Sequence, residues 1–340
     1  MRLLEKINSL NRRLYPVGID MDGDRLRLLQ LSGDSRDNGL RLVGLGSEAR
    51  PVDVEYGSGQ WQRWAIETIK NLIAGDGFAG KEVVGSLPAN EVFVSTVKVS
   101  DNVETSLEEA VFSKIGAKLG YGFEEAMIRC VRCDEDNVVV MALERKRIDS
   151  YLAIYEEAHL RLKSICVWPM ALIEAYKNFF GRRKSDIDSI VMLVDIGAEF
   201  TKVVICKHGE LLFGRLIPIG ACNLGSGADD VSLGGLTHEV MVARRDFGRM
   251  YKNAQIERLI FFSGRAVSRE SYMAIARQLE MPAQIGDCFG AVEVADSDAG
   301  MLDRSIEDIE SGVVRVEDFG WATAFGLSLS GHGEDKKWLI

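Results

Sequence analysis

The sequence predicts an α/β protein made of two related lobes that face each other across a central cleft. Three observations lead to this prediction. The chain has 340 residues, which is enough for two apolar cores. Strand-sized apolar runs alternate with amphipathic segments of helical length. A strand–turn–strand hairpin occurs twice, headed once by Asp20 and once by Asp195.

Composition and charge exclude several classes of protein. With 46% hydrophobic and 27% charged residues, the chain has the balance of a globular protein. Its formal net charge of −10 argues against nucleic acid as a partner, because phosphate binding needs a basic face. No apolar run approaches the roughly 18 residues that a membrane-spanning helix needs, and no secretory signal opens the chain. We therefore expect a soluble, cytoplasmic protein.

The N-terminal segment, residues 1–15, has an amphipathic pattern. Basic residues occupy much of one face, and five apolar residues recur at helical spacing: Leu3, Leu4, Ile7, Leu10 and Leu14. Such a helix is typical of peripheral contact with an anionic membrane surface. A helix docked on the body of the protein, or a frayed terminus, explains the pattern equally well.

The first lobe is expected over residues 16–185, with an inserted subdomain at about 90–145. Alternating and continuous apolar runs predict strands, in chain order, over 17–21, 26–31, 40–49, 81–87, 91–99, 126–133, 137–143 and 162–167. Helical periodicity predicts helices over 60–73, about 103–119, 146–158 and 169–180. The polar segment 182–186 is predicted to link the lobes.

The second lobe is expected over residues 186–330, followed by a short tail at 331–340. Its opening strands, over 190–196, 201–206 and 211–217, repeat the order seen at the start of the first lobe. The two hairpins align with an offset of 175 residues (195 − 20), which matches Arg27 with Lys202. A duplication on this scale indicates two related lobes.

The repeated hairpins also suggest a ligand. Asp20 and Asp195, at matching strand ends, are expected to converge on the cleft and to hold Mg²⁺ through water. Glycines in the following turns, Gly23 and Gly197, would let the backbone approach a phosphate group closely.

Several segments together resemble one protein family. They are Val17–Asp20, Leu193–Ala198 with Thr201, Leu216–Gly220, Leu259–Gly264 and Ala322–Leu327. The first segment is similar to the first phosphate motif of the PilM-like type IV pilus assembly proteins, and the next two are similar to their second phosphate motif. The fourth segment is similar to the adenosine motif of that family, and the fifth to its terminal helix. That family lies within the actin/Hsp70/hexokinase superfamily and has a domain plan similar to that of the cell-division protein FtsA. The resemblance covers about residues 16–330 and implies an actin-like fold with an inserted subdomain.

The resemblance also implies a function. A PilM-like protein would be a scaffold or adaptor, cytoplasmic and peripheral to the inner membrane, in type IV pilus assembly or type II protein secretion. Its partner would be the short tail of a bitopic membrane protein, PilN-like or of the GspL/GspM type, bound between the first lobe and its insertion. Val92, Phe93 and Val94 are candidates for that groove, although core packing also explains them. Homo-oligomer formation stays open.

By the same resemblance, ATP and Mg²⁺ are the expected cofactors. The corresponding residues are Asp20, Gly23, Asp195, Gly197, Thr201, Glu239, Gly264 and Arg265. Three departures argue against tight nucleotide binding: Asp22 and Asp24 crowd the first turn, Glu199 and Phe200 replace small residues in the second, and Arg265 follows Gly264.

These departures favour a non-catalytic protein or a very slow ATPase over an efficient enzyme. An active ATPase or small-molecule kinase of the same superfamily is the alternative, and a GspL-like secretion protein is a third interpretation. The sequence assigns no catalytic residue beyond Asp20 or Asp195.

Overall fold

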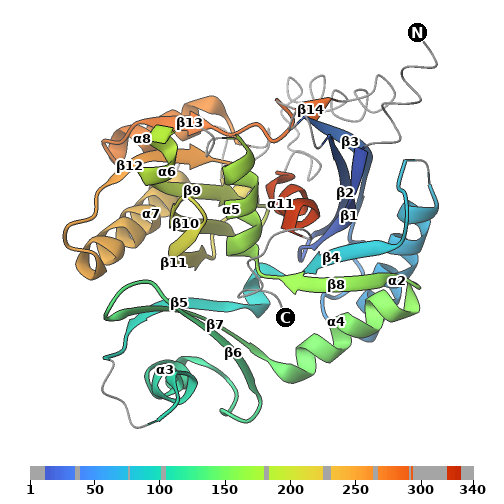
Figure 1. Cartoon of the computed structure of the whole chain (residues 1–340), viewed down its shortest axis with the longest axis horizontal. Helices are drawn as coiled ribbons and strands as arrows, with labels where there is room; N and C mark the ends of the chain where they lie inside the picture. Colours follow the sequence, from blue (N-terminus) through green and yellow to red (C-terminus); the bar gives the residue numbers. More distant parts are fainter. Residues whose placement is uncertain are drawn as a thin grey trace.

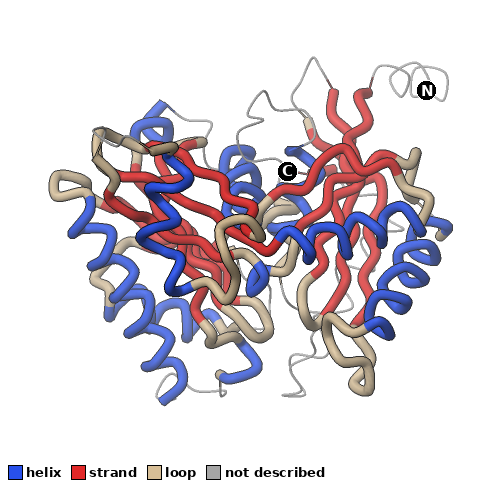
Figure 2. Tube along the Cα trace, turned by 90° about the horizontal axis from the view of Figure 1, so that it is seen from below, coloured by secondary structure: helices blue, strands red, loops and turns tan. Residues whose placement is uncertain are grey.

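The computed structural model describes residues 12–34, 39–75, 77–100, 105–179, 184–224, 231–262, 267–290, 292–293 and 320–330. This part of the chain forms two lobes, each built on its own sheet, and a smaller subdomain next to them (Figure 1). Figure 2, turned by 90°, shows the sheets of the two lobes beside each other with helices along their outer sides. Among the described residues, no helix is long and apolar enough to cross a membrane.

The first lobe is built on a six-stranded sheet with the strand order β14-β3-β2-β1-β4-β8. Its strands are β1 (Arg12–Met21), β2 (Arg25–Asp34), β3 (Leu40–Ala49), β4 (Glu82–Ser86), β8 (Arg161–Cys166) and β14 (Val292–Glu293). The first three form an antiparallel meander, whereas β4 and β8 run parallel to β1 and to each other. Helices α2 (Gly59–Ala74) and α4 (Arg145–Glu157) pack against this sheet and against each other.

The second lobe repeats the meander within a five-stranded sheet of order β11-β10-β9-β12-β13. Its strands are β9 (Ile190–Ile196), β10 (Thr201–Lys207), β11 (Glu210–Ile217), β12 (Ile256–Phe261) and β13 (Ala283–Ile285). Three helices of this lobe or next to it are α5 (Trp168–Phe179), α7 (Val231–Met250) and α8 (Arg269–Gln278). Helix α5 packs on β10 and β11, and α7 packs on α8 and β11.

Strand β9 shows why the second sheet is buried on both faces. Val191 and Leu193 join the core shared with α5 and the first lobe, whereas Met192 and Val194 join the core under α7 and α8. Successive side chains of a strand point to opposite faces. A continuous apolar run is therefore the pattern expected of a strand covered on both sides.

The inserted subdomain has a three-stranded sheet of order β5-β7-β6 and one helix. Its elements are β5 (Phe93–Lys98), α3 (Leu107–Ile115), β6 (Ala126–Arg132) and β7 (Asn137–Glu144). Helix α3 begins with a capping box, in which Ser106 and Glu109 each bond the other's backbone N–H. Alternate residues of β7 divide between two cores, Val138 and Val140 facing the subdomain's own core and Val139 and Met141 facing the main core.

Three sequence expectations differ from the structure. Strand β1 begins at Arg12, so the last residues of the segment 1–15 are extended rather than helical, and residues 1–11 lie outside the described part. The helix expected over about 103–119 spans only Leu107–Ile115 and continues as a 3₁₀ turn at Gly116–Lys118. Glycine at position 116 favours this early ending, because it is a poor helix former.

The third difference concerns the linker predicted at 182–186. Its last three residues lie in the short helix α6 (Lys184–Asp188), while residues 180–183 are outside the described part. Asp186 pairs with Arg258 of β12 at 2.6 Å, which fixes this helix to the second lobe.

The C-terminal helix α11 (Ala322–Ser330) lies between the lobes, against β1 and β2 on one side and α5 on the other (Figure 1). Close approach depends on two glycines: a Cβ at Gly18 would stand 2.2 Å from the Ala324 oxygen, and one at Gly326 would stand 1.8 Å from the Ala171 oxygen. The hydroxyl of Ser328 also donates to the Pro16 carbonyl at 2.8 Å.

Replacing Gly326 with alanine tests this packing. The added methyl group would collide with the backbone of α5, so we expect Gly326→Ala to lower the free energy of unfolding by at least about 2 kcal/mol. Gly39→Ala is the matched control, because a Cβ there meets nothing within 4 Å; its effect should stay within about 0.5 kcal/mol. Urea unfolding measures both, and equal stabilities would contradict the close packing of α11.

Candidate functional site

Both repeated hairpins place a basic residue directly opposite their leading aspartate. In the first, Asp20 of β1 faces Arg27 of β2, and in the second, Asp195 of β9 faces Lys202 of β10. The offset is 175 residues for the acids (195 − 20) and for the bases (202 − 27). The duplication therefore repeats an acid–base pair, and all four side chains are buried.

The carboxylate of Asp20 has one hydrogen-bond partner and one ion-pair partner within the first lobe. Ser86, at the end of β4, donates its hydroxyl to Oδ1 at 2.9 Å, and Arg27 lies 4.0 Å from Oδ2. The same guanidinium lies 4.0 Å from Asp24. Burial raises the pKa of Asp20 and that of Asp24, although Arg27 opposes the rise in both.

The turn of the first hairpin is closed on itself. Gly23 donates its N–H to the Asp22 carboxylate at 3.1 Å, and its carbonyl accepts from the Arg50 guanidinium at 2.6 Å. Asp22 N–H also bonds the Arg25 carbonyl at 3.1 Å. The N–H that the sequence offered to a phosphate group is thus engaged by a carboxylate of the same turn.

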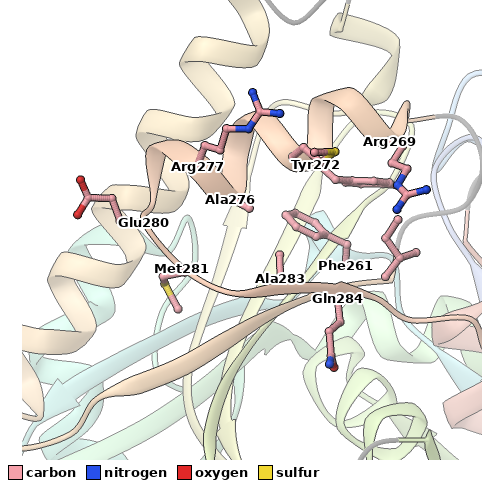
Figure 3. A pocket seen from close by; sticks show the side chains of 11 residues that line it. Phe261, Arg269, Tyr272, Ala276, Arg277, Glu280, Met281, Ala283 and Gln284 are labelled. Carbon is pink, nitrogen blue, oxygen red and sulfur yellow. The ribbon is translucent and has the colours of Figure 1, made fainter.

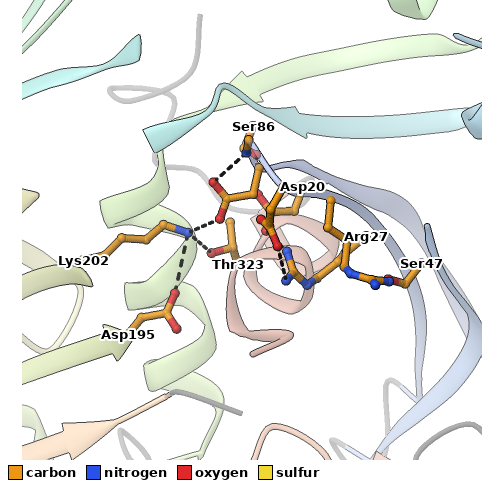
Figure 4. Close-up of polar contacts among 11 residues, drawn as sticks. Asp20, Arg27, Ser47, Ser86, Asp195, Lys202 and Thr323 are labelled. Atoms are coloured by element: carbon orange, nitrogen blue, oxygen red, sulfur yellow. Dashed lines mark hydrogen bonds and ion pairs between the residues drawn. The ribbon is translucent and has the colours of Figure 1, made fainter. Parts of the chain in front are cut away.

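Lys202 joins the two lobes. Its ammonium nitrogen lies 3.4 Å from Asp22 of the first lobe, 3.6 Å from Asp195 of the second and 3.4 Å from the Thr323 hydroxyl of α11. Figure 4 shows the side chain reaching from β10 toward these groups. The side chain is only 5% exposed. Three segments far apart in the sequence therefore share one buried cation.

The charges in this cluster shift one another. Burial would lower the pKa of Lys202, but Asp22 and Asp195 outweigh burial and raise it above its ordinary value. Burial would likewise raise the pKa of Asp22, but Lys202 and Arg27 reverse the effect and the net shift is downward. Lys202 and Asp22 consequently form a charged pair across the lobes.

Polar groups of the second turn also form hydrogen bonds with other groups of the second lobe. Gly197 donates its N–H to the Phe200 carbonyl at 2.9 Å, and its own carbonyl accepts from Ala221 N–H at 2.8 Å. The Thr201 hydroxyl donates to the Ile219 carbonyl at 2.7 Å. These bonds shape a tight turn after β9 and engage the Gly197 N–H and the Thr201 hydroxyl within the protein.

The remaining predicted site residues lie elsewhere or outside the described part. Glu239 on α7 forms an ion pair with Arg215 of β11 at 2.9 Å. Gly264 and Arg265 are not among the described residues. The facing hairpins thus carry Asp20, Asp195, Gly23, Gly197 and Thr201, whereas Glu239 lies on α7 with Arg215 as its partner.

The contacts of Asp20 and Asp195 show whether a Mg²⁺ ion would fit between them. Mg²⁺ needs carboxylate oxygens and ordered waters in a near-octahedral shell. The Lys202 ammonium already stands between Asp22 and Asp195. A divalent ion about 4 Å from a charged ammonium is repelled by on the order of 8 kcal/mol at an effective dielectric constant near 20. Within the described ranges no group of three or more metal-binding side chains is found. The residues present do not fit the ion.

Sequence reasoning aligned Lys202 with Arg27 but did not assign either to the site. The signal available was the spacing: each base follows its aspartate by seven positions (27 − 20 and 202 − 195). In a tight hairpin, that spacing places the two residues directly opposite each other.

A second polar site lies where the chain enters and leaves the inserted subdomain. A hollow of about 250 Å³ is lined by Glu55, Tyr56, Gly57, Ser58, Glu91 and Arg147. The Arg147 guanidinium lies 3.5 Å from Glu91 and 3.7 Å from Glu144. Behind these charges, the rings of Tyr56 and Tyr151 pack edge-on against Trp61 at 5.1 and 5.8 Å.

The groove candidates Val92, Phe93 and Val94 are engaged in packing. Val92 is buried in the main core, and Phe93 packs on the core of the inserted subdomain. A Cβ at Gly214 of β11 would stand 2.7 Å from Val94, so β5 lies tightly against the second lobe. In the described part of the chain, β6 forms the other edge of this three-stranded sheet.

A larger hollow, of about 740 Å³, lies at the outer edge of the second sheet (Figure 3). Phe261, Tyr272 and Met281 give it an apolar lining, and Arg269 and Arg277 of α8 add positive charge. It borders β13, which is separated from β9 by β12. It is therefore distinct from the hairpins that carry Asp20 and Asp195.

The pH dependence of stability tests the burial of Asp195. Burial, with repulsion from Asp22 and Asp20, raises the pKa of Asp195 from 3.8 to about 6, although Lys202 opposes the rise. The folded state thus holds this proton more tightly than the unfolded chain. The resulting stability is fully present below pH 3.8 and is lost as the pH rises through about 6.

Because asparagine does not titrate, Asp195→Asn should lack this loss. Between about pH 4 and pH 7, the free energy of unfolding of the variant should gain roughly 2 kcal/mol relative to the unsubstituted protein. Urea unfolding followed by tryptophan fluorescence at several pH values gives the difference. A difference that does not change with pH would contradict the raised pKa.

Comparisons with known proteins bear on the family and the fold of this chain. The sequence profile described as "Type IV pilus assembly protein PilM" matches residues 18–226. A solved structure described as a "PilM-PilN type IV pilus biogenesis complex" is similar at a TM-score of 0.69 and 19% identity, covering 94% of this chain and 99% of that one. This likeness confirms the predicted actin-like fold.

Other solved structures are less similar. The cytoplasmic domain of EpsL, an inner-membrane component of the type II secretion system of Vibrio cholerae, has a TM-score of 0.46 and 9% identity, with 83% of this chain and 85% of that one covered. The ethanolamine utilization protein EutJ from Carboxydothermus hydrogenoformans has a TM-score of 0.45 and 14% identity, with 93% and 89% covered. A search of curated sequences found no match.

The matched profile spans 209 residues (226 − 18 + 1), more than half of the 340-residue chain, and it includes both acid–base hairpins and the inserted subdomain. The chain belongs to the PilM family of type IV pilus assembly proteins.

Proposed function

We propose that this protein is an adaptor on the cytoplasmic face of the inner membrane, where it binds the tail of a bitopic, PilN-like partner during pilus assembly. The observation that carries this proposal is the polar hollow at the base of the inserted subdomain, around Glu91 and Arg147. Family membership supports the proposal, and the similar solved structure is itself described as a complex of PilM with PilN.

The hollow has the features of a peptide site. Arg147 and Glu91 offer a cation and an anion to polar groups of a tail, and Tyr56 presents a hydroxyl beside them. The Arg145 N–H bonds the Glu125 carbonyl at 2.9 Å, so the start of β6 lies next to the start of α4 and hence next to the hollow. An extended tail leaving the hollow would meet the edge of β6, where strand addition supplies backbone hydrogen bonds.

An adaptor fits the cleft better than an enzyme does. A kinase or ATPase of this fold would need its cleft aspartates to position a metal ion. In the described part of the cleft, Asp20 contacts Arg27 and Asp195 contacts Lys202. The ATP and Mg²⁺ expected from the resemblance are therefore not assigned a role in the proposed function.

Parallel titrations distinguish the two functions. A synthetic peptide with the sequence of the partner's cytoplasmic tail should raise the melting temperature toward saturation, whereas ATP with Mg²⁺ should leave it unchanged. Stabilisation by ATP with Mg²⁺, without a response to the tail, would contradict the adaptor and favour the enzyme.

Arg147 is the residue to change in the proposed groove. Its guanidinium is 49% exposed, and exposed ion pairs contribute little to folding, so Arg147→Ala should lower stability by less than about 1 kcal/mol. We expect it to weaken tail binding roughly tenfold, as measured by anisotropy of a labelled peptide.

Arg161→Ala is the matched control. This arginine is 73% exposed and pairs with Glu82 beyond the opposite end of α4, at the start of β8. Its substitution should leave tail affinity unchanged. Equal affinities for the Arg147 and Arg161 variants would contradict the proposal that the tail binds in the hollow around Arg147.

A further inference from the structure

Lys202 is a buried cation that the proposed adaptor function does not use. Its ammonium group contacts Asp22 at 3.4 Å, Asp195 at 3.6 Å and Thr323 at 3.4 Å. These partners come from the β1–β2 turn, from β9 and from α11. The contacts therefore join the first lobe, the second lobe and the helix between them through one nitrogen atom.

The negative charges around this ammonium group are of the kind that surrounds a bound metal ion. The two facing hairpins carry aspartates at or next to their turns: Asp20, Asp22 and Asp24 in the first, and Asp195 in the second. Arg27 lies beside Asp20 and Asp24, whereas Lys202 is the cation beside Asp22 and Asp195. Without Lys202, the latter two would face each other across the lobes with no opposite charge in contact among the described residues.

We propose that Lys202 is a built-in counterion that takes the place of a divalent cation and holds the lobes together without nucleotide. A lysine ammonium is compact and strongly hydrated, and it sits on a flexible stem, so it can replace a small hard cation between carboxylates. Because it is covalently attached, its local concentration does not depend on the metal or nucleotide content of the surroundings. This inference does not depend on where the partner's tail binds.

Chemical rescue tests the proposal. Lys202→Ala leaves an anionic space, and loss of one partner from a buried ion pair is strongly destabilising. We expect the melting temperature to fall by on the order of 5–10 °C. Millimolar MgCl₂, compared with NaCl at equal ionic strength, should restore much of the loss in the variant and leave the unsubstituted protein unchanged.

Lys207→Ala is the matched control on the same strand. Lys207 pairs with Asp188 at 3.9 Å, and its side chain is 44% exposed, so its removal should change the melting temperature by no more than about 1–2 °C and create no response to Mg²⁺. Direct binding is measured with Mn²⁺ by electron paramagnetic resonance. One Mn²⁺ should bind to Lys202→Ala, and none should bind to the unsubstituted protein.

A second variant keeps the test decisive if Lys202→Ala does not fold. Lys202→Met combined with Asp195→Asn keeps the apolar stem and removes one unpaired carboxylate, so it should fold and show no rescue by Mg²⁺. Stoichiometric Mn²⁺ binding to the unsubstituted protein would overturn the proposal. So would a Lys202→Ala variant that is as stable as the control, or a double variant that Mg²⁺ rescues.

Discussion

The relative position of the two lobes depends on an ion pair between the buried Lys202 and the partly buried Asp22. A charge removed from water is tolerated only when opposite charges and hydrogen-bonding groups surround it. Lys202 meets this requirement only when the first lobe, the second lobe and α11 are all in place, since each supplies one of its three oxygen partners. Separating the lobes would expose the Lys202 ammonium group to water or leave it without its oxygen partners. The ion pair therefore specifies the alignment of the lobes more than it adds net stability.

Apolar packing supplies the rest of the connection. Helix α11 fits between β1 and α5 because Gly18 and Gly326 leave no side chain in the contact. The short strand β14 pairs with β3, which returns the chain from the second lobe to the edge of the first sheet. The inserted subdomain is anchored in the same way, with β5 packed on β11 at Gly214. The hollow at Arg147 and the edge of β6 are the surfaces of this region to which the proposed partner tail is assigned.

The fold was largely predictable from the sequence, because the two hairpins repeat both their apolar period and their acidic residue. The site was less predictable. Asp20 and Asp195 stood out as carboxylates at strand ends, but their use as partners of Arg27 and Lys202 depends on strand register, which the pattern alone does not fix. The inter-lobe contact of Lys202 with Asp22 is tertiary and has no local signal. The length of α3 was overestimated because the helical pattern continues past Gly116, where the backbone tightens into a 3₁₀ turn.

The most direct test of the account is to observe the Lys202 ammonium group itself. In protein labelled with ¹⁵N-lysine, exposed ammonium groups exchange with water too fast to be seen at mildly alkaline pH, whereas a buried, paired one persists in ¹H–¹⁵N spectra. We predict one persistent ammonium signal that is absent from Lys202→Arg and that does not move when MgCl₂ and ATP are added. Absence of the signal from the unsubstituted protein, or its displacement by Mg²⁺ and ATP, would contradict the role of Lys202 as the buried counterion between the lobes.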